Sequence, residues 1–277
     1  MQNGVFQFDH VVIAGVSLEE TMNRYVGRGF FVHPGGFETV LPADEAHMRF
    51  PNRTGIQFIR VHTGRRYKWK RKRSYRQFRK SANSDGSVCY TTRTYRYFDR
   101  GPQGYKGYAF FAPATEEVRA HLSDCGYLCA GTTRYHHLDG TSVSFETYVD
   151  AASLALPVVY LGEQPQGEQQ ANASTGVFRV EIGAQRPSEI VQKIETLTGE
   201  SLLDARSADV PRPTVRVGDV NLEISSVDTG LEEGVLETGL RAGFPGHNVL
   251  YDPDRNDSAA VHVNYRPGSA EESESAL

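Results

Sequence analysis

The chain has 277 residues, an apolar fraction of 39% and a formal net charge of −4 at pH 7. This length allows one large domain or two smaller ones, with a substantial buried core. No stretch has the length and apolar character of a membrane span, and the first residues lack the basic and apolar regions of a secretory signal. The three cysteines, Cys89, Cys125 and Cys129, offer no disulfide framework. We therefore expect a globular protein of the cytoplasm.

A strand, a helix and a second strand are predicted at the N-terminus. The apolar run over residues 8–13, with His10 near its start, is typical of a buried strand. Ser17 and Glu20 have the spacing of a capping box, which predicts a helix start, and Gly29 marks the helix end. This order places His10, a candidate metal ligand or base, on the first strand.

The same pattern recurs twice along the chain. Gly107 and Gly126 are 19 positions apart, which is also the separation between His10 and Gly29. A looser copy begins at residue 177 and reaches Gly199. Repetition at this scale indicates an architecture built from repeated units. We predict that each copy is one βαβββ module.

The remaining elements complete these modules. A β-rich run over residues 55–61 closes the first module. In the second, Asp139-Gly140 lies between two β-favouring runs and predicts a hairpin. The third ends in a strand over residues 220–224, and residues 235–265 could supply part of a fourth.

Taken together, these motifs resemble the vicinal oxygen chelate superfamily, and most closely its glyoxalase-like domain branch (the glyoxalase, bleomycin resistance and extradiol dioxygenase type). The likeness covers residues 6–62 and 105–163, and more faintly residues 175–226. It is carried by residues 8–13, by Gly29-Phe30 followed by residues 34–36, and by residues 156–160. The resemblance implies an α+β fold in which tandem βαβββ modules curl mixed β-sheets around a shared cavity.

Composition suggests how the modules are arranged. We expect paired modules in residues 1–163, a basic insertion over residues 64–104, and a second, more divergent βαβββ region over residues 176–266. Residues 164–175 lack large apolar side chains and are predicted to form a linker. Residues 267–277 are small and acidic, which predicts a disordered tail.

The resemblance also implies a site. In this superfamily, the first and last strands of the modules commonly present His, Gln or Glu to a divalent metal, which polarises a substrate oxygen or activates dioxygen. His10 matches the first position. The last strand of module one offers Gln57, Phe58 or Ile59 where a carboxylate is expected, and that of module two offers Tyr160 or Leu161. In the third module Glu223 matches the pattern.

A second ligand set is conceivable around the predicted hairpin. His10, with His136 or His137 and with Glu146, would form a two-histidine, one-carboxylate site suited to Fe(II). The alternatives are a Glu146 paired with a nearby Arg on a solvated face, and a His10 that is hydrogen-bonded beside an apolar cavity. The candidate metal ligands are His10, His137, Glu146 and Glu223; the candidate catalytic residues are His10, Glu146 and Tyr160; the candidate substrate-binding residues are Tyr108, Phe110 and Phe58.

The insertion carries an unusual charge. Between residues 65 and 80 there are ten Lys or Arg residues and no Asp or Glu, interleaved with aromatic residues. Such a segment can neutralise phosphates and stack on bases, although the acidic balance of the rest of the chain repels a polyanion. A solvated loop, or a segment that docks on an acidic surface or a second subunit, is the alternative. The representative basic residues are Arg71, Arg73 and Arg76.

The leading hypothesis is a small-molecule enzyme whose substrate binds in the cavity between modules one and two. The resemblance implies a lyase, an isomerase or a ring-opening dioxygenase that depends on a divalent metal such as Fe, Zn, Mn or Ni. A metal-free protein that sequesters an aromatic or planar compound is the second hypothesis. The third is a nucleic-acid or partner-binding protein that uses the basic segment. Modules can pair within or between chains, so a homodimer is also considered.

Overall fold

The computed structural model describes residues 4–14, 17–35, 37–38, 43–61, 104–136, 142–150, 155–202, 212–227 and 234–242. The predictions made for the basic segment with Arg71, Arg73 and Arg76, for His137 and for the C-terminal tail lie outside the described residues. Among the described residues, no helix has both the length and the apolar character needed to cross a bilayer.

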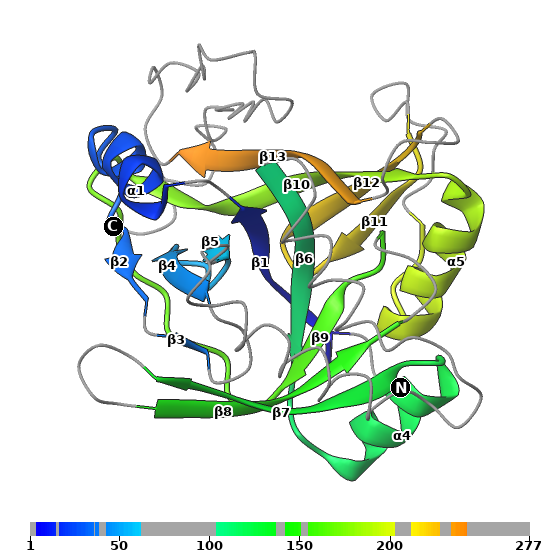
Figure 1. Cartoon of the computed structure of the whole chain (residues 1–277). Helices are drawn as coiled ribbons and strands as arrows, with labels where there is room; N and C mark the ends of the chain where they lie inside the picture. The colour runs from blue at the N-terminus through cyan, green and yellow to red at the C-terminus, as the bar shows by residue number, and fades with distance from the viewer. Residues whose placement is uncertain are drawn as a thin grey trace, which may run out of the picture.

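The first two modules form a single sheet of nine strands (Figure 1). Its order is β2-β4-β5-β1-β6-β9-β8-β7-β3. Module one contains β1 (Gln7–Ala14), α1 (Leu18–Val26), β2 (His33–Pro34), β3 (Phe37–Glu38), β4 (Ala43–Arg49) and β5 (Gly55–Val61). Module two contains β6 (Gly104–Ala112), α4 (Glu116–Asp124), β7 (Leu128–His136), β8 (Ser142–Val149) and β9 (Val158–Leu161). The expected α+β class with tandem modules is confirmed.

The two modules meet along β1 and β6, which pair antiparallel at the centre of the sheet. Each of these strands pairs parallel with the last strand of its own module, β1 with β5 and β6 with β9. Strands β2 and β3 are separated by only two residues in the chain, yet they lie at opposite edges of the sheet. The sheet must therefore be strongly curled. The curl creates the concave face on which the candidate site lies.

The third module forms a separate sheet of four strands in the order β11-β12-β10-β13. It contains β10 (Ser174–Ala184), α5 (Pro187–Thr198), β11 (Thr214–Val217) and β12 (Val220–Ser226), and β13 (Gly234–Ala242) follows it. β10 pairs parallel with β12 and antiparallel with β13. β1 likewise pairs parallel with β5 and antiparallel with β6, the first strand of the next module. By this correspondence, β13 takes the position of the first strand of a fourth module.

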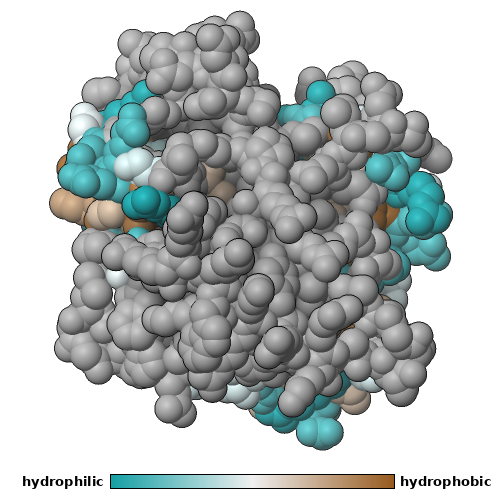
Figure 2. All heavy atoms as spheres, in the orientation of Figure 1, coloured by the Kyte–Doolittle hydropathy of each residue, from teal (hydrophilic) through white to brown (hydrophobic). Residues whose placement is uncertain are grey.

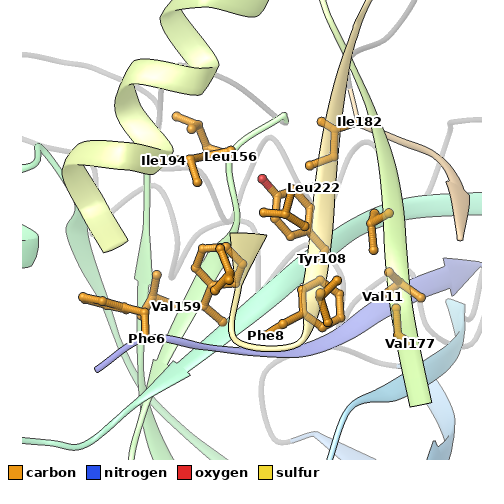
Figure 3. Packing of buried hydrophobic residues seen from close by; sticks show 14 of the residues in the cluster. Phe6, Phe8, Val11, Tyr108, Leu156, Val159, Val177, Ile182, Ile194 and Leu222 are labelled. Atoms are coloured by element: carbon orange, nitrogen blue, oxygen red, sulfur yellow. The ribbon is translucent and has the colours of Figure 1, made fainter. Parts of the chain in front are cut away.

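The hydrophobic core lies between the two sheets (Figure 3). Phe8 and Val11 of β1 and Tyr108 of β6 pack toward Val177 and Ile182 of β10. Burying such large apolar side chains contributes roughly 1.5–3 kcal/mol each. One face of β1 is therefore committed to the core, and the side chains on its other face are free to form a site.

Local sequence signals mark the start of α1 and the turn that follows each helix. Ser17 accepts a hydrogen bond from the backbone N–H of Glu20 at the start of α1. Gly29, Gly126 and Gly199 follow α1, α4 and α5 in the left-handed conformation, with φ of 79°, 83° and 73°, which glycine adopts at little cost. The outer surface of α5, at the right of the molecule in Figure 2, is hydrophilic, so this helix buries one face only.

The connection between modules two and three is irregular but closely packed on module one. Gln170 is buried; its side-chain oxygen accepts from the backbone N–H of Phe31 at 2.7 Å, and its Nε2 donates to the backbone carbonyl of Arg49 at 2.6 Å. Glu168 pairs with His33 at 2.6 Å, and the backbone N–H of Asn172 donates to the carbonyl of Gly29. Side-chain amides replace apolar contacts here, which explains why composition alone predicts a loose linker.

Replacing Gln170 by Ala should lower the free energy of unfolding by about 2 kcal/mol, because two backbone groups lose their buried partner. The neighbouring Gln169, which is exposed, provides the matched control, and its replacement by Ala should change stability by less than about 0.5 kcal/mol. Urea unfolding of both variants measures the difference. Equal stabilities would contradict a docked connection.

Candidate active site

A cavity of about 650 Å³ lies on the concave face of the nine-stranded sheet. Strands of module one form its floor, strands β6, β8 and β9 of module two form a wall, and the connection after β9 contributes to the rim. The floor residues are Asp9, His10, His47, Arg49 and Gln57; the wall residues are Phe111, Val143, Ser144, Phe145 and Tyr160; the rim residues include His33, Gly35, Glu163, Gln164, Pro165 and Gln166.

A β-bulge explains why two consecutive residues, Asp9 and His10, both line the cavity. In a regular strand, neighbouring side chains point to opposite faces. The pairing of β1 with β6 shifts register here, since Phe8 pairs with Phe110 whereas His10 pairs with Ala109. A bulge places two residues of one strand opposite one of the other and re-aims a side chain. The shift thus brings a carboxylate and an imidazole to the same side of the sheet.

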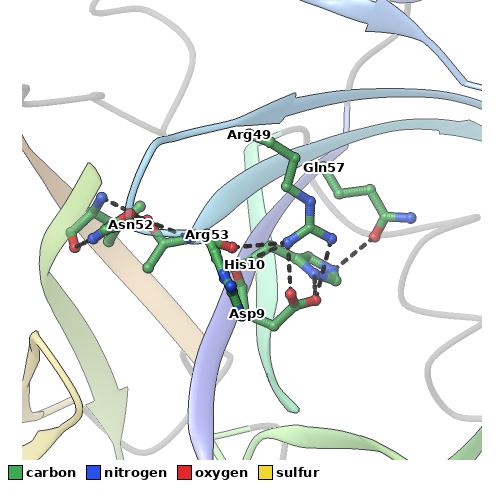
Figure 4. A network of polar contacts seen from close by, with 8 residues as sticks. Asp9, His10, Arg49, Asn52, Arg53 and Gln57 are labelled. Carbon is green, nitrogen blue, oxygen red and sulfur yellow. Dashed lines mark hydrogen bonds and ion pairs between the residues drawn. The ribbon is translucent and has the colours of Figure 1, made fainter. Parts of the chain in front are cut away.

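Asp9 joins His10 to Arg49 at the floor of the cavity (Figure 4). Its Oδ2 lies 2.6 Å from His10 Nδ1, and its carboxylate also accepts hydrogen bonds from the Arg49 guanidinium. Burial by itself raises the pKa of Asp9, but the Arg49 and His10 charges and hydrogen bonds outweigh it and hold the pKa well below its usual range. Asp9 is therefore ionised at neutral pH and fixes the orientation of the imidazole.

The second nitrogen of His10 leads into a chain of polar groups. Nε2 lies 3.1 Å from Gln57 Oε1, and Gln57 Nε2 donates to Glu45 Oε2 at 2.9 Å. The same carboxylate oxygen lies 3.5 Å from His47 Nε2. Glu45 is almost fully buried, and within the described residues its Oε1 has no hydrogen-bond partner. Burial raises the pKa of Glu45 to about 7, against a lowering by the Gln57 hydrogen bond.

Aromatic side chains form the module-two wall. The Tyr160 ring lies nearly parallel to the His10 ring, with centroids 5.9 Å apart and an interplanar angle of 16°. Phe145 meets Tyr160 edge-on at 4.7 Å, and Phe111 lies tilted against it at 6.4 Å. Phe111 and Tyr160 are register partners on the first and last strands of module two. Rings thus line the module-two side at the strands where the resemblance leads us to expect ligands.

The predicted substrate-binding residues lie on the opposite face. Tyr108 and Phe110 are core residues of β6 that contact Phe8, and the Tyr108 hydroxyl donates to the carbonyl of Ala155 at 2.9 Å. Phe58 packs against Tyr25 of α1. The alternation of β6 turns Phe111 rather than Phe110 to the cavity, and β5 turns Gln57 rather than Phe58. The sequence pattern does not decide which side chains of these strands face the cavity, because both faces carry large side chains.

The structure does not bring the predicted carboxylates together with His10. Glu146 lies on the face of β8 away from Phe145 and accepts three hydrogen bonds from Arg119 of α4, the shortest at 2.7 Å. These bonds lower the pKa of Glu146. Glu223 lies on β12 of the other sheet, where its Oε1 forms an ion pair with Arg179 Nε at 2.7 Å. The arginine pairing considered for Glu146 is therefore the arrangement observed.

Among the described residues, the groups around His10 do not form a site of three His, Cys, Asp or Glu ligands. Nε2 faces the amide oxygen of Gln57, and module two contributes aromatic rings rather than carboxylates to the described part of the cavity. Metal sites of this superfamily type need at least three such ligands with an open position. We therefore derive no chemistry through a metal.

Several site residues were not singled out from the sequence. On β4, Glu45, His47 and Arg49 alternate with the apolar Ala46 and Met48. An alternation of this kind predicts one polar and one buried face, and it was the available signal. No comparable signal exists for Asp9, whose position depends on the bulge, or for Phe145, which depends on the register of the β7–β8 hairpin.

Replacing Glu45 by Gln should change the pH dependence of stability. A folded-state pKa of about 7 instead of 4.5 makes the folded wild type bind more protons than the unfolded chain between these pH values, so its stability falls as pH rises through them. Glu45→Gln has no carboxyl to ionise. Relative to wild type it should gain on the order of 3 kcal/mol between about pH 4.5 and pH 7, measured by urea unfolding. A difference that does not vary with pH would contradict the buried acid.

Comparisons with known proteins agree with this architecture. A family model described as a glyoxalase-like domain matches residues 8–198. The structure of a hypothetical protein from Staphylococcus aureus superposes with a TM-score of 0.68 at 11% identity, covering 95% of this chain and 100% of that one. A mutant of 4-hydroxymandelate synthase from Streptomyces coelicolor gives a TM-score of 0.54 at 11% identity, covering 88% and 72%.

At these identities the structural likeness is one of fold alone. A search of curated proteins finds no match. The family match spans well over half of the chain, from the first strand through the helix of the third module. The chain therefore belongs to the glyoxalase-like domain family, as its resemblance to the vicinal oxygen chelate superfamily indicated.

Proposed function

We propose that the protein is a small-molecule enzyme that binds its substrate in the cavity between modules one and two and uses His10 for proton transfer. The observation that carries this proposal is the Asp9–His10 pair at the cavity floor, with 2.6 Å between Oδ2 and Nδ1. Glyoxalase-like proteins are often enzymes that act on small molecules in such a cavity, and the fold supports the same location here.

The pair has the arrangement of an acid–base dyad. The ionised Asp9 accepts a hydrogen bond from Nδ1–H, which leaves Nε2 as the nitrogen that exchanges a proton with a substrate. The Arg49 guanidinium donates a hydrogen bond to Oδ1 of Asp9, while Oδ2 contacts His10. The carboxylate that orients the imidazole is therefore itself fixed in place. In the ligand-free protein Nε2 contacts Gln57, and a substrate must take the place of this contact. His10 would then accept a proton from the substrate and return it at the end of the reaction.

This chemistry favours two of the expected reaction classes. Isomerases and lyases proceed by removal and return of a proton, for which a positioned imidazole suffices. A ring-opening dioxygenase needs a metal to activate dioxygen, and the described residues contain no group of three His, Cys, Asp or Glu ligands that supports this reading. We therefore propose isomerase or lyase chemistry at an acidic C–H or O–H of the substrate.

The cavity also indicates the kind of substrate. Its volume of about 650 Å³ is within the usual range for small-molecule sites. The wall of Phe111, Phe145 and Tyr160 offers aromatic faces and edges, which favour a planar or aromatic ligand. The polar floor would then meet the reacting end of that ligand.

A metal-free binding protein is the second candidate. It is favoured by one observation, that both ring nitrogens of His10 are already hydrogen-bonded without a ligand. Such a site could hold an aromatic compound without transforming it. The two candidates share the cavity and differ in whether His10 exchanges a proton with the ligand. Nucleic-acid or partner binding by the basic segment, and a homodimer, stay predictions.

Deuterium exchange separates the two candidates. Aromatic ketones with an acidic C–H would first be screened for binding by thermal shift, and the loss of that C–H signal in D₂O would then be followed by proton NMR. His10→Asn keeps an amide N–H toward Asp9 but has no group at the Nε2 position. We expect it to bind the ketone and to lower the exchange rate by about 100-fold or more.

The matched control is His121→Asn, which alters a histidine of α4 that lies outside the cavity and contacts the carbonyl of Leu197. It should exchange like wild type. Exchange that is equally fast in His10→Asn would show that His10 is not the base. Binding by wild type with no exchange would favour the sequestering protein.

A further inference from the structure

The connection between modules two and three forms part of the cavity as well as linking the modules. Four consecutive residues that follow β9 line the cavity, namely Glu163, Gln164, Pro165 and Gln166. They belong to the segment that packs on module one through Gln170. A ligand in the cavity therefore meets this connection in addition to the strands of the two modules.

Close backbone packing at Gly167 fixes the position of this wall. A Cβ added there would lie 2.6 Å from the carbonyl oxygen of Pro51 and closer still to that of Phe50. Real Cβ atoms do not approach backbone oxygens so closely, so the connection can lie here only because the residue is glycine. Phe50 and Pro51 directly follow Arg49, which is part of the cavity floor. The wall is thus held at a fixed distance from the floor.

The charged residues that line the cavity leave one carboxylate over. Among the described lining residues, the carboxylates are Asp9 and Glu163, and the only Lys or Arg is Arg49. The Arg49 guanidinium forms an ion pair with Asp9, so these two charges offset each other. Glu163 is exposed at the rim, where a carboxyl is ionised at neutral pH. The rim is therefore the negative end of the cavity.

The histidines on the β2 and β4 side do not reverse this balance. His33 lies 2.6 Å from Glu168, and His47 lies 3.5 Å from Glu45. Each of these histidines thus already faces a carboxylate. Within the described lining residues, an anionic group near the rim meets Glu163 and no cation that lacks a carboxylate neighbour.

We propose that the connection is a specificity-determining wall, and that Glu163 selects aromatic ligands whose outer end carries a neutral or cationic group rather than an anionic one. The inference rests on the proposed function, in which the aromatic wall holds the planar body and the polar floor meets the reacting end. The opposite end of such a ligand then reaches the rim. Glu163 attracts a cationic substituent there and repels a carboxylate or phosphate.

Three para-substituted acetophenones serve as probes, bearing an aminomethyl, a hydroxymethyl or a carboxylate group. They share the aromatic ketone and differ in the charge of the outer end at pH 7. Isothermal titration calorimetry with the full chain at low ionic strength measures their affinities. We expect the aminomethyl probe to bind about threefold more tightly than the hydroxymethyl probe, as for one exposed charge pair, and the carboxylate probe to bind most weakly. Added salt should reduce both differences.

Variants of Glu163 assign this preference to its charge. Glu163→Gln should bind the aminomethyl and hydroxymethyl probes equally, and Glu163→Lys should favour the carboxylate probe. The matched control is Glu19→Gln, which removes the same charge from an exposed position of α1 outside the cavity, and it should keep the order of the wild type. A carboxylate probe that binds as tightly as the hydroxymethyl probe, a preference that survives Glu163→Gln, or no binding of any probe would overturn the proposal.

Gly167→Ala tests the wall itself. The added Cβ must push the connection away from Phe50 and Pro51, so the affinities for the aminomethyl and hydroxymethyl probes should both fall severalfold. Gly107→Ala is the matched control, because its Cβ meets no atom within 4 Å. Unchanged affinities in a folded Gly167→Ala would contradict a wall built by the connection. If Gly167→Ala does not fold, the comparisons at Glu163 still decide.

These affinities are independent of turnover. Probes that bind in the expected order but exchange no deuterium would retain the specificity of the wall and remove the proposed enzymatic function. Exchange that depends on His10, together with a carboxylate probe that binds most tightly, would retain the function and remove Glu163 from ligand selection.

Discussion

The buried carboxylate of Asp9 is the interaction on which the candidate site depends. It is 1% exposed and lies between the Arg49 guanidinium and the His10 imidazole. A buried charge of this kind is tolerable only when it is paired, and removing one partner commonly costs about 3–5 kcal/mol. Arg49 therefore stabilises β1 against β4, and His10 is oriented in the same step. The β-bulge between Phe8 and His10 turns Asp9 and His10 to the same side of the sheet, which allows this pairing.

The internal repeat shows how one scaffold carries different chemistry. In module one, His10 contacts Gln57 on the last strand, two residues before its register partner Val12. In module three, Arg179 contacts Glu223 with the same offset from Glu181. The histidine–glutamine hydrogen bond of one sheet thus corresponds to an arginine–glutamate ion pair in the other. In module two, aromatic rings occupy the cavity face of the corresponding strands.

The sequence predicts the features that local chemistry determines. The capping of α1 by Ser17, the left-handed glycines after the helices, the β7–β8 hairpin and the repeated modules all follow from short-range patterns, and the structure has them. The family resemblance is likewise confirmed. Each of these features needs only a few neighbouring residues to be specified.

What the sequence leaves open depends on long-range partners. Glu146 has the chemistry of a ligand, but Arg119 lies beside it once α4 packs on β8. Phe110 and Phe111 are adjacent and equally apolar, so only the strand register decides which one faces the cavity. The linker has no large apolar side chains, and its docking relies on Gln170 meeting backbone groups from two other segments. Such contacts have no signature within one stretch of chain.

The central proposal is that the cavity floor transfers protons through His10 without a metal. Equilibrium dialysis of the purified full chain against Zn²⁺ and Mn²⁺, with His10→Asn in parallel, tests it most directly. The account predicts that neither protein retains a stoichiometric metal and that the two behave alike. One equivalent of metal held by the wild type and lost in His10→Asn would contradict it, because Nε2 would then be a ligand rather than the nitrogen that carries the proton.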